Sequence, residues 1–189
     1  AWYQLPMPGS LTMHGDEAAA CFLALLQDAV SKHLRADVDV GSCLSGGVDS
    51  SALVMLMSEQ LKAAGASELL NTVTARFEGT SVDETGYADL VTEAAHARRH
   101  ATRPRPEDVL SEAREIVWHQ DEPYGSTSIH AQWHVFKTAR ANGLKVMLDG
   151  QGADEILAGY HGVYDLRLLE LGRKLRLVAA LRFATQRAR

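Results

Sequence analysis

Residues 45–51 read SGGVDSS, a composition suited to a loop that binds phosphate. Gly46 and Gly47 allow the backbone to approach a ligand closely, and Ser45 and Ser50 add hydroxyl groups near the start of an expected helix. The loop is not a Walker A sequence, because no GxxxxGK string occurs and no lysine ends it. A second interpretation stays open, namely a glycine-rich turn with a capping serine and no ligand.

A carboxylate within this loop, that of Asp49, would repel a phosphate unless a cation lies between them. Mg²⁺ prefers hard oxygen ligands and often bridges carboxylates to phosphates, so we expect a bound Mg²⁺. A second acidic loop, residues 149–155 (DGQGADE), also follows an expected strand. Ligands of parallel sheets gather at the carboxyl ends of strands, so Asp49 and Asp154 are expected to share the metal. For the second loop alone, a turn whose Asp154 and Glu155 stabilise a helix N-terminus is the alternative.

Strands and helices alternate along the part of the chain that must position these loops. We expect strands over 37–44, 70–77 and 145–149, and helices over 16–34, 52–64, 84–99, 107–119 and 128–141. Ser50 or Ser51 is expected to cap the helix over 52–64. This order predicts an α/β fold, a doubly wound parallel sheet covered on both faces. Residues 162–189 are expected to form one amphipathic basic helix or a pair.

Composition narrows the class of protein. The chain has 189 residues, 46% of them hydrophobic, which fits one globular domain, and its net charge of −5 argues against general nucleic-acid binding. Cys21 and Cys43 are too few for a disulfide framework, so a reducing cytoplasm is expected. No apolar stretch approaches the length of a membrane span, and residues 1–15 lack a signal-peptide pattern. Those first residues are interpreted as a linker from a preceding domain.

Four segments of the chain resemble the synthetase domain of asparagine synthetases, within the N-type ATP-pyrophosphatases. They are SGGVDSS at 45–51, DETGYADLV at 83–91, DEPYGSTSIHAQW at 121–133 and DGQGADEILAGY at 149–160. The resemblance implies an adenine nucleotide alpha hydrolase-like (ATP-pyrophosphatase) domain over 16–160, and a truncated helical lobe beginning in 161–189. It also implies that ATP is split to AMP and pyrophosphate, which activates a carboxylate, by default aspartate, for attack by ammonia to give asparagine.

The same resemblance implies roles for individual residues. Ser45, Gly46, Gly47, Asp49 and Ser50 are expected to hold the phosphates, and Leu44, Ala75 and Gly150 to contact the nucleotide, while Asp49 and Asp154 bind Mg²⁺. Gln151 and Asp154 are assigned to the catalytic loop. Ser126, Thr127 and Ser128 are placed near the substrate, although a helix N-cap is an equally good interpretation of this turn.

Departures from the family pattern leave alternatives open. Gln151 replaces the glutamate frequent in asparagine synthetases and the tyrosine of β-lactam synthetases, and it cannot act as a base. Arg76 stands where a small residue is common, and it either contacts phosphate or points outward. The glutaminase domain is not in this chain, so ammonia is expected from outside it. A related adenylating enzyme and a non-catalytic nucleotide-binding module remain alternatives, and the oligomeric state is open, with a homodimer as one option.

Two histidines and one cysteine are not expected to take part in the chemistry. His130 and His134 have the spacing of metal ligands on a helix, but HAQWH lacks the glutamate of HExxH. We therefore expect surface or partly buried histidines. Cys43, two residues before the loop, is expected to be a small side chain packed in the protein interior.

Overall fold

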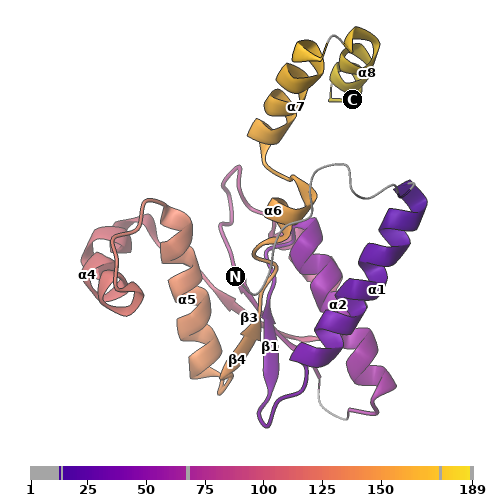
Figure 1. The fold of residues 1–189 in the computed structure, drawn as a ribbon. Helices are drawn as coiled ribbons and strands as arrows, with labels where there is room; N and C mark the ends of the chain where they lie inside the picture. The colour runs from indigo at the N-terminus through magenta and orange to yellow at the C-terminus, as the bar shows by residue number, and fades with distance from the viewer. Residues whose placement is uncertain (1–12, 14, 67–68, 175, 188–189) are drawn as a thin grey trace. The chain divides into compact units, whose positions relative to one another are not determined.

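The computed structural model describes residues 13, 15–66, 69–174 and 176–187 (Figure 1). It divides into two compact units, Ala1–Asp149 and Gly150–Arg189, and each is described by itself. The domain boundary between residues 160 and 161, taken from the family resemblance, stays a prediction. The expected linker over 1–15 lies almost entirely outside the described residues.

A parallel sheet of four strands forms the centre of the first unit. The strands are β1 (Val40–Cys43), β2 (Asn71–Ala75), β3 (Arg98–Thr102) and β4 (Val146–Leu148), in the spatial order β3-β2-β1-β4. Gly41 of β1 pairs with Asn71 on one side and with Met147 on the other. The strand order therefore reverses beside β1, and ligands of such sheets bind outside the carboxyl ends of the strands at that point.

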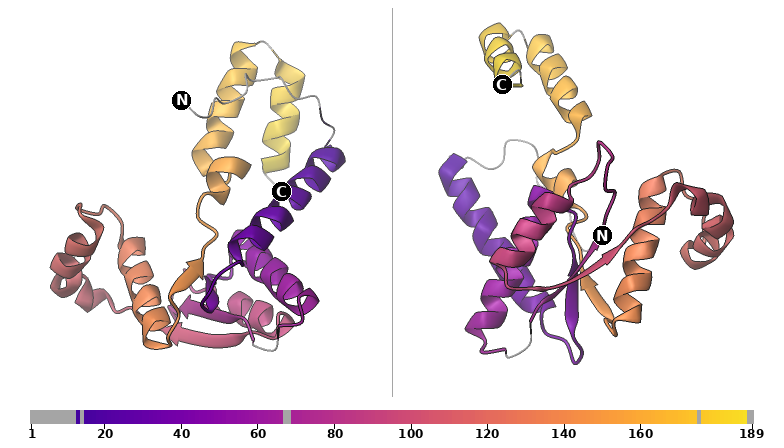
Figure 2. Two further views of the ribbon diagram at one scale, coloured as in Figure 1. Left: turned by 60° about the horizontal axis from the view of Figure 1, so that its bottom comes forward. Right: turned by 180° about the vertical axis from the view of Figure 1, so that it is seen from behind.

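Helices cover both faces of this sheet, as predicted for a doubly wound fold. On one face α2 (Val48–Ala63) packs between α1 (Gly15–His33) and α3 (Thr85–Ala94). On the other face, α5 (Thr127–Ala141) packs over β2 and β3. Helix α4 (Val109–Gln120), which follows the short 3₁₀ helix η1 (Pro106–Asp108), packs against α5. The views in Figure 2 show the same two layers of helices.

Apolar side chains fill the space between the sheet and each helical layer. Under α2 the side chains of Val54 and Met57 are fully buried beside Leu44 and Val30. Under α5 a smaller cluster contains Val73, Val135, Ala139 and Leu144. Burying such side chains contributes about 1.5–3 kcal/mol each, so these clusters hold β1 and the loop after it in place.

Two expectations about secondary structure are wrong. Helix α2 begins at Val48 rather than Ala52, and Gly47 is its N-cap, so Ser50 and Ser51 lie inside the helix instead of capping it. The helix expected over 84–99 ends at Ala94, and Arg98 and Arg99 belong instead to β3, because His96 adopts a left-handed backbone (φ 52°) and the following segment pairs with β2. β3 is an edge strand with exposed side chains, so its sequence RRHAT carries no apolar signal.

The second unit contains α6 (Ala153–Leu157), α7 (His161–Arg173) and α8 (Leu177–Arg187). Helices α7 and α8 pack together, and the rings of Tyr164 and Phe183 stack with centroids 5.8 Å apart. Of the two alternatives predicted for the tail, one helix or a pair, the pair is therefore the one observed. Among the described residues, no helix combines the length and apolar character needed to cross a membrane.

Candidate functional site

The predicted phosphate loop connects β1 to α2 at the carboxyl edge of the sheet. The Leu44 amide donates to the Val73 carbonyl at 3.0 Å, which extends the pairing of β1 with β2 up to the loop. Gly46 then has φ +98°, and a Cβ there would lie 2.6 Å from the Glu84 carbonyl oxygen. Only glycine fits this position, because the loop lies against the start of α3. The DETGY segment at 83–87 therefore packs against the phosphate loop.

Hydroxyl groups fix the shape of the loop from within. The Ser45 hydroxyl oxygen accepts a hydrogen bond from the Gly47 amide at 3.1 Å. The buried Ser50 hydroxyl donates to the Gly47 carbonyl at 3.1 Å, and it lies 3.0 Å from the Ser45 hydroxyl. Ser50 therefore braces the loop, whereas Ser45 is exposed. Direct contacts of either serine with phosphate remain predictions.

The N-terminus of α2 provides the electrostatics of the site. Among the described residues, no side chain caps α2, so its first amide groups stay available to an anion at the positive end of the helix dipole. Asp49 lies half-buried in this first turn. Amide donors suit phosphate oxygens and a carboxylate suits a hard cation, so the residues present fit a phosphate with Mg²⁺.

At the reversal of strand order, Cys43 of β1 meets Asp149, which directly follows β4. The Ser42 hydroxyl joins these strands by donating to the Leu148 carbonyl at 3.1 Å. Gln132 of α5 donates from Nε2 to Asp149 Oδ2 at 3.2 Å. Burial, followed by the charge and the hydrogen bond of Asp149, raises the pKa of Cys43 to about 12, which keeps the thiol protonated and unreactive.

Gln132 and Asp149 join the site although the sequence, which places both in segments that resemble the family, predicted no individual role for either. Asp149 was detectable, because a carboxylate directly after a buried strand lies at the ligand-binding edge. The contact of Gln132 with Asp149 could not be predicted, since it depends on how α5 packs over the sheet. The hydrogen bonds of Asp149 with Gln132 and with Cys43 hold this residue beside the carboxyl end of β1.

The neighbouring strand β2 ends at the half-buried Ala75, the predicted nucleotide contact. The next residue, Arg76, donates to Asp89 Oδ1 at 2.9 Å and to Glu78 Oε1 at 3.4 Å. Its side chain is only 16% exposed, so of the two alternatives the one in which it points outward is wrong. A contact of Arg76 with phosphate remains a prediction.

The hydroxyl-rich turn before α5 has the N-cap geometry weighed from the sequence. Ser126 is the N-cap, and its side chain accepts a hydrogen bond from the Ser128 amide at 3.2 Å. The two hydroxyls lie 2.8 Å apart, and Ser126, Thr127 and Ser128 are all exposed. The N-cap interpretation is confirmed, while the role of the three residues in substrate binding remains a prediction.

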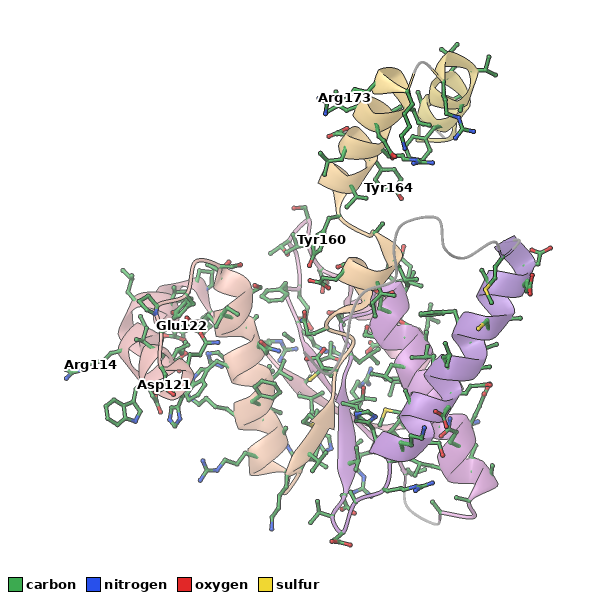
Figure 3. All side chains as sticks on the ribbon, viewed as in Figure 1. Arg114, Asp121, Glu122, Tyr160, Tyr164 and Arg173 are labelled. Atoms are coloured by element: carbon green, nitrogen blue, oxygen red, sulfur yellow. The ribbon has the colours of Figure 1, made fainter. Side chains whose placement is uncertain are left out.

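The second predicted loop begins at Asp149, the last residue of the first unit, and its residues 150–155 belong to the second unit. Gly152 (φ +93°) is the N-cap of α6, and Asp154 and Glu155 lie in its first turn, as the alternative interpretation expected. The Asp154 carboxylate lies against Gly159, where an added Cβ would come 1.9 Å from Asp154 Oδ1. The Tyr160 hydroxyl, labelled in Figure 3, donates to Glu155 Oε1 at 2.6 Å and lowers the pKa of Glu155.

The remaining members of this loop, Gly150 and Gln151, are half-buried and exposed respectively. Their predicted roles as nucleotide contact and catalytic-loop residue are untested by this geometry. The shared metal site of Asp49 and Asp154 likewise remains a prediction, because the two carboxylates belong to different units.

Two features on α4 and α5 lie apart from the predicted phosphate loop. His130 is only 3% exposed, so the expectation of a surface or partly buried histidine is wrong for it, and both His130 and His134 bond Glu112. A cavity of about 720 Å³ runs along α4 and the turn after it, where Figure 3 labels Arg114, Asp121 and Glu122. None of the predicted site residues lines this cavity, and the carboxyl edge of the sheet is the better candidate site on chemical grounds.

Comparison with known proteins gives consistent matches. A protein of Mycobacterium bovis, provisionally named a glutamine-hydrolysing asparagine synthetase, is 39% identical over 137 residues, 72% of this chain and 20% of its own length. Amidase chyE of Penicillium rubens is 31% identical over 147 residues, 71% of this chain and 21% of its own length. The chain thus spans about a fifth of the length of these curated relatives.

Among solved structures, the NAD⁺ synthetase of Burkholderia pseudomallei has a TM-score of 0.42 and 16% identity, covering 73% of this chain and 62% of that one. The profile of the asparagine synthase family matches residues 22–188. This range includes α2, the loop before it and all four strands. Because the match extends over most of the sequence, the chain belongs to the asparagine synthase family.

Proposed function

We propose that this domain binds ATP with Mg²⁺ and activates a carboxylate, by default that of aspartate, as an acyl-adenylate. A carboxylate oxygen attacks the α-phosphorus, and the bond to the β-phosphate breaks with release of pyrophosphate. Ammonia, delivered by a glutaminase domain outside this chain, then displaces AMP to give asparagine. The observation that supports this proposal is the glycine loop before α2, at the point where the strand order reverses.

Each part of the loop has a task in this proposal. The first amides of α2 hold pyrophosphate oxygens, and Gly46 and Gly47 keep the backbone within reach. The carboxylates of Asp49 and Asp154 would hold Mg²⁺, which supplies charge neutralisation that makes pyrophosphate a better leaving group. The hydroxyls of the Ser126 turn bind the polar end of the substrate, because they are exposed beside a helix N-terminus.

A second candidate is a related adenylating enzyme that joins another carboxylate to an amine. Gln151 supports it, since an amide cannot replace the acid–base chemistry of a glutamate at this position. One of the relatives is named an amidase rather than an asparagine synthetase. A nucleotide-binding module without turnover is the third candidate, and it differs from both in its lack of pyrophosphate chemistry.

Isotope exchange between pyrophosphate and ATP separates these candidates. The assay contains this chain, ATP, Mg²⁺ and one of a panel of carboxylates that includes aspartate. The Asp49→Asn variant is compared with a matched control, Asp28→Asn, which changes an exposed carboxylate of α1. Exchange that requires aspartate and is lost only in Asp49→Asn supports the first proposal. Exchange with another carboxylate supports the second candidate. ATP binding without exchange contradicts both enzymes and supports the module.

A further inference from the structure

Helices α4 and α5 bring three metal-ligating side chains together on the first unit. His130 and His134 stand one turn apart on α5, and Glu112 reaches them from α4. Glu112 Oε2 lies 2.9 Å from His130 Nε2 and 2.7 Å from His134 Nε2. All three potential ligand atoms lie within 4.8 Å of one another. A carboxylate from a second helix thus joins the two imidazoles as a potential third ligand.

The donor set suits a divalent transition-metal ion. Two imidazoles and one carboxylate form the protein ligands of many zinc sites with an open fourth position. Zn²⁺ at about 2.1 Å from each ligand would set neighbouring ligand atoms about 3.4 Å apart. The two hydrogen-bonded distances, 2.9 and 2.7 Å, are shorter than this by about 0.5 and 0.7 Å, a change within the reach of the Glu112 side chain. Coordination therefore requires the Glu112 carboxylate to move away from both imidazole nitrogens by a fraction of an ångström.

Surrounding contacts orient these ligands. Lys137 Nζ lies 3.1 Å from Glu112 Oε1, so it holds that oxygen and leaves Oε2 directed at both imidazoles. A ligating carboxylate commonly has such a partner for its second oxygen. The positive charge of Lys137 opposes a bound cation, but its side chain is 48% exposed, and solvent screens that repulsion. Arg114, a cation of α4 that Figure 3 labels, points away from α5.

Burial gives the cluster a closed side and an open side. The His130 side chain is 3% exposed, whereas those of His134 and Glu112 are 17% and 19% exposed. An ion can therefore enter past His134 and Glu112 and retain water in its fourth position. Coordination replaces the Nε2 protons that bond Glu112 in the metal-free form, so uptake moves or releases those protons.

We propose that Glu112, His130 and His134 bind one divalent transition-metal ion of the Zn²⁺ class. The ion ties α4 to α5 and keeps an open position for water. The site uses none of the residues assigned to ATP or its Mg²⁺, so this proposal stands whether or not the chain is an amide-forming enzyme.

The test uses metal-stripped chain titrated with Co²⁺ and with Zn²⁺. We expect one Co²⁺ per chain with the intense visible absorption of a four- or five-coordinate site, and its displacement by one Zn²⁺. Glu112→Gln and His134→Ala should each weaken Zn²⁺ binding at least about tenfold. His33→Ala, a substitution of an exposed histidine on α1, should leave binding unchanged.

Folding is monitored in parallel by circular dichroism and thermal melting. Zn²⁺ at saturating concentration should raise the melting temperature of the wild type and of His33→Ala, and not that of His134→Ala. Failure of the folded wild type to take up one ion would overturn the proposal even if a variant does not fold. Uptake that persists equally in Glu112→Gln and His134→Ala would place the ion elsewhere and overturn it as well.

Discussion

Replacement of Gly46 by alanine tests whether the loop before α2 is held by close packing against α3. Gly46 has φ +98°, and the new Cβ would lie 2.6 Å from the Glu84 carbonyl oxygen and 3.1 Å from the Ala88 amide nitrogen. The left-handed backbone alone costs an alanine about 1–2 kcal/mol. Displacing backbone atoms of α3 adds about 1–3 kcal/mol, the usual range for overpacking. The expected loss in free energy of unfolding is therefore about 2–5 kcal/mol.

Gly79→Ala is the matched control, because Gly79 has φ +81° with open space around its would-be Cβ. It should lose only the backbone contribution, about 1–2 kcal/mol. Urea unfolding followed by tryptophan fluorescence measures both, and with a slope of about 2 kcal/mol/M the midpoints should fall by about 1–2.5 M for Gly46→Ala and 0.5–1 M for Gly79→Ala. Equal shifts for the two variants would refute the close packing of the loop on α3.

Further substitutions test the core, the sheet edge and the buried thiol. Met57→Ala should cost about 2–5 kcal/mol in urea unfolding because its side chain is fully buried, whereas Leu110→Ala, 88% exposed, should change stability by less than about 0.5 kcal/mol. Ser58→Ala should cost about 1–3 kcal/mol, because it leaves the Ala95 carbonyl without its buried 2.8 Å hydrogen bond; a neutral result would contradict that contact. Cys43 should resist alkylation at pH 9 in the folded chain, since its pKa is about 12, and Asp149→Asn should lower that pKa and speed the reaction. Because the pKa of Cys43 is higher in the folded chain than in the unfolded chain, the free energy of unfolding should fall as pH rises from about 9 to 12. If the free energy of unfolding of the wild type, compared with that of Cys43→Ala, does not change over this range, the buried environment assigned to Cys43 is contradicted.

The sequence predicted the architecture well where local pattern and tertiary structure agree. The apolar spacing of α1 and α2, the glycine loop and the order of elements led to a parallel doubly wound sheet. The edge strand β3 was missed because its pairing with β2 is made by backbone groups, which leave little trace in side-chain pattern. The start of α2 was placed too late, since a glycine N-cap gives a weaker signal than the serines that follow it.

The candidate site was predictable only where its residues are neighbours in sequence. The loop at 44–50 follows from its own composition. The contacts of Gln132 with Asp149 and of Glu112 with two histidines join residues 17 to 22 positions apart, and they depend on how α4 and α5 pack. Arg76 illustrates the same limit, because its neutralisation by Asp89 requires knowledge of where α3 lies.

Calorimetric titration of the chain with ATP, in the presence and absence of Mg²⁺, tests the central claim most directly. The account predicts saturable binding that requires Mg²⁺ and is weakened at least about tenfold, or 1.4 kcal/mol, by Asp49→Ala and by Asp154→Ala. Asp28→Ala, at an exposed ion pair of α1, should bind as the wild type does. A folded chain that binds no ATP, or binds it equally well in all three variants, would contradict the assignment of the glycine loop and of the two carboxylates.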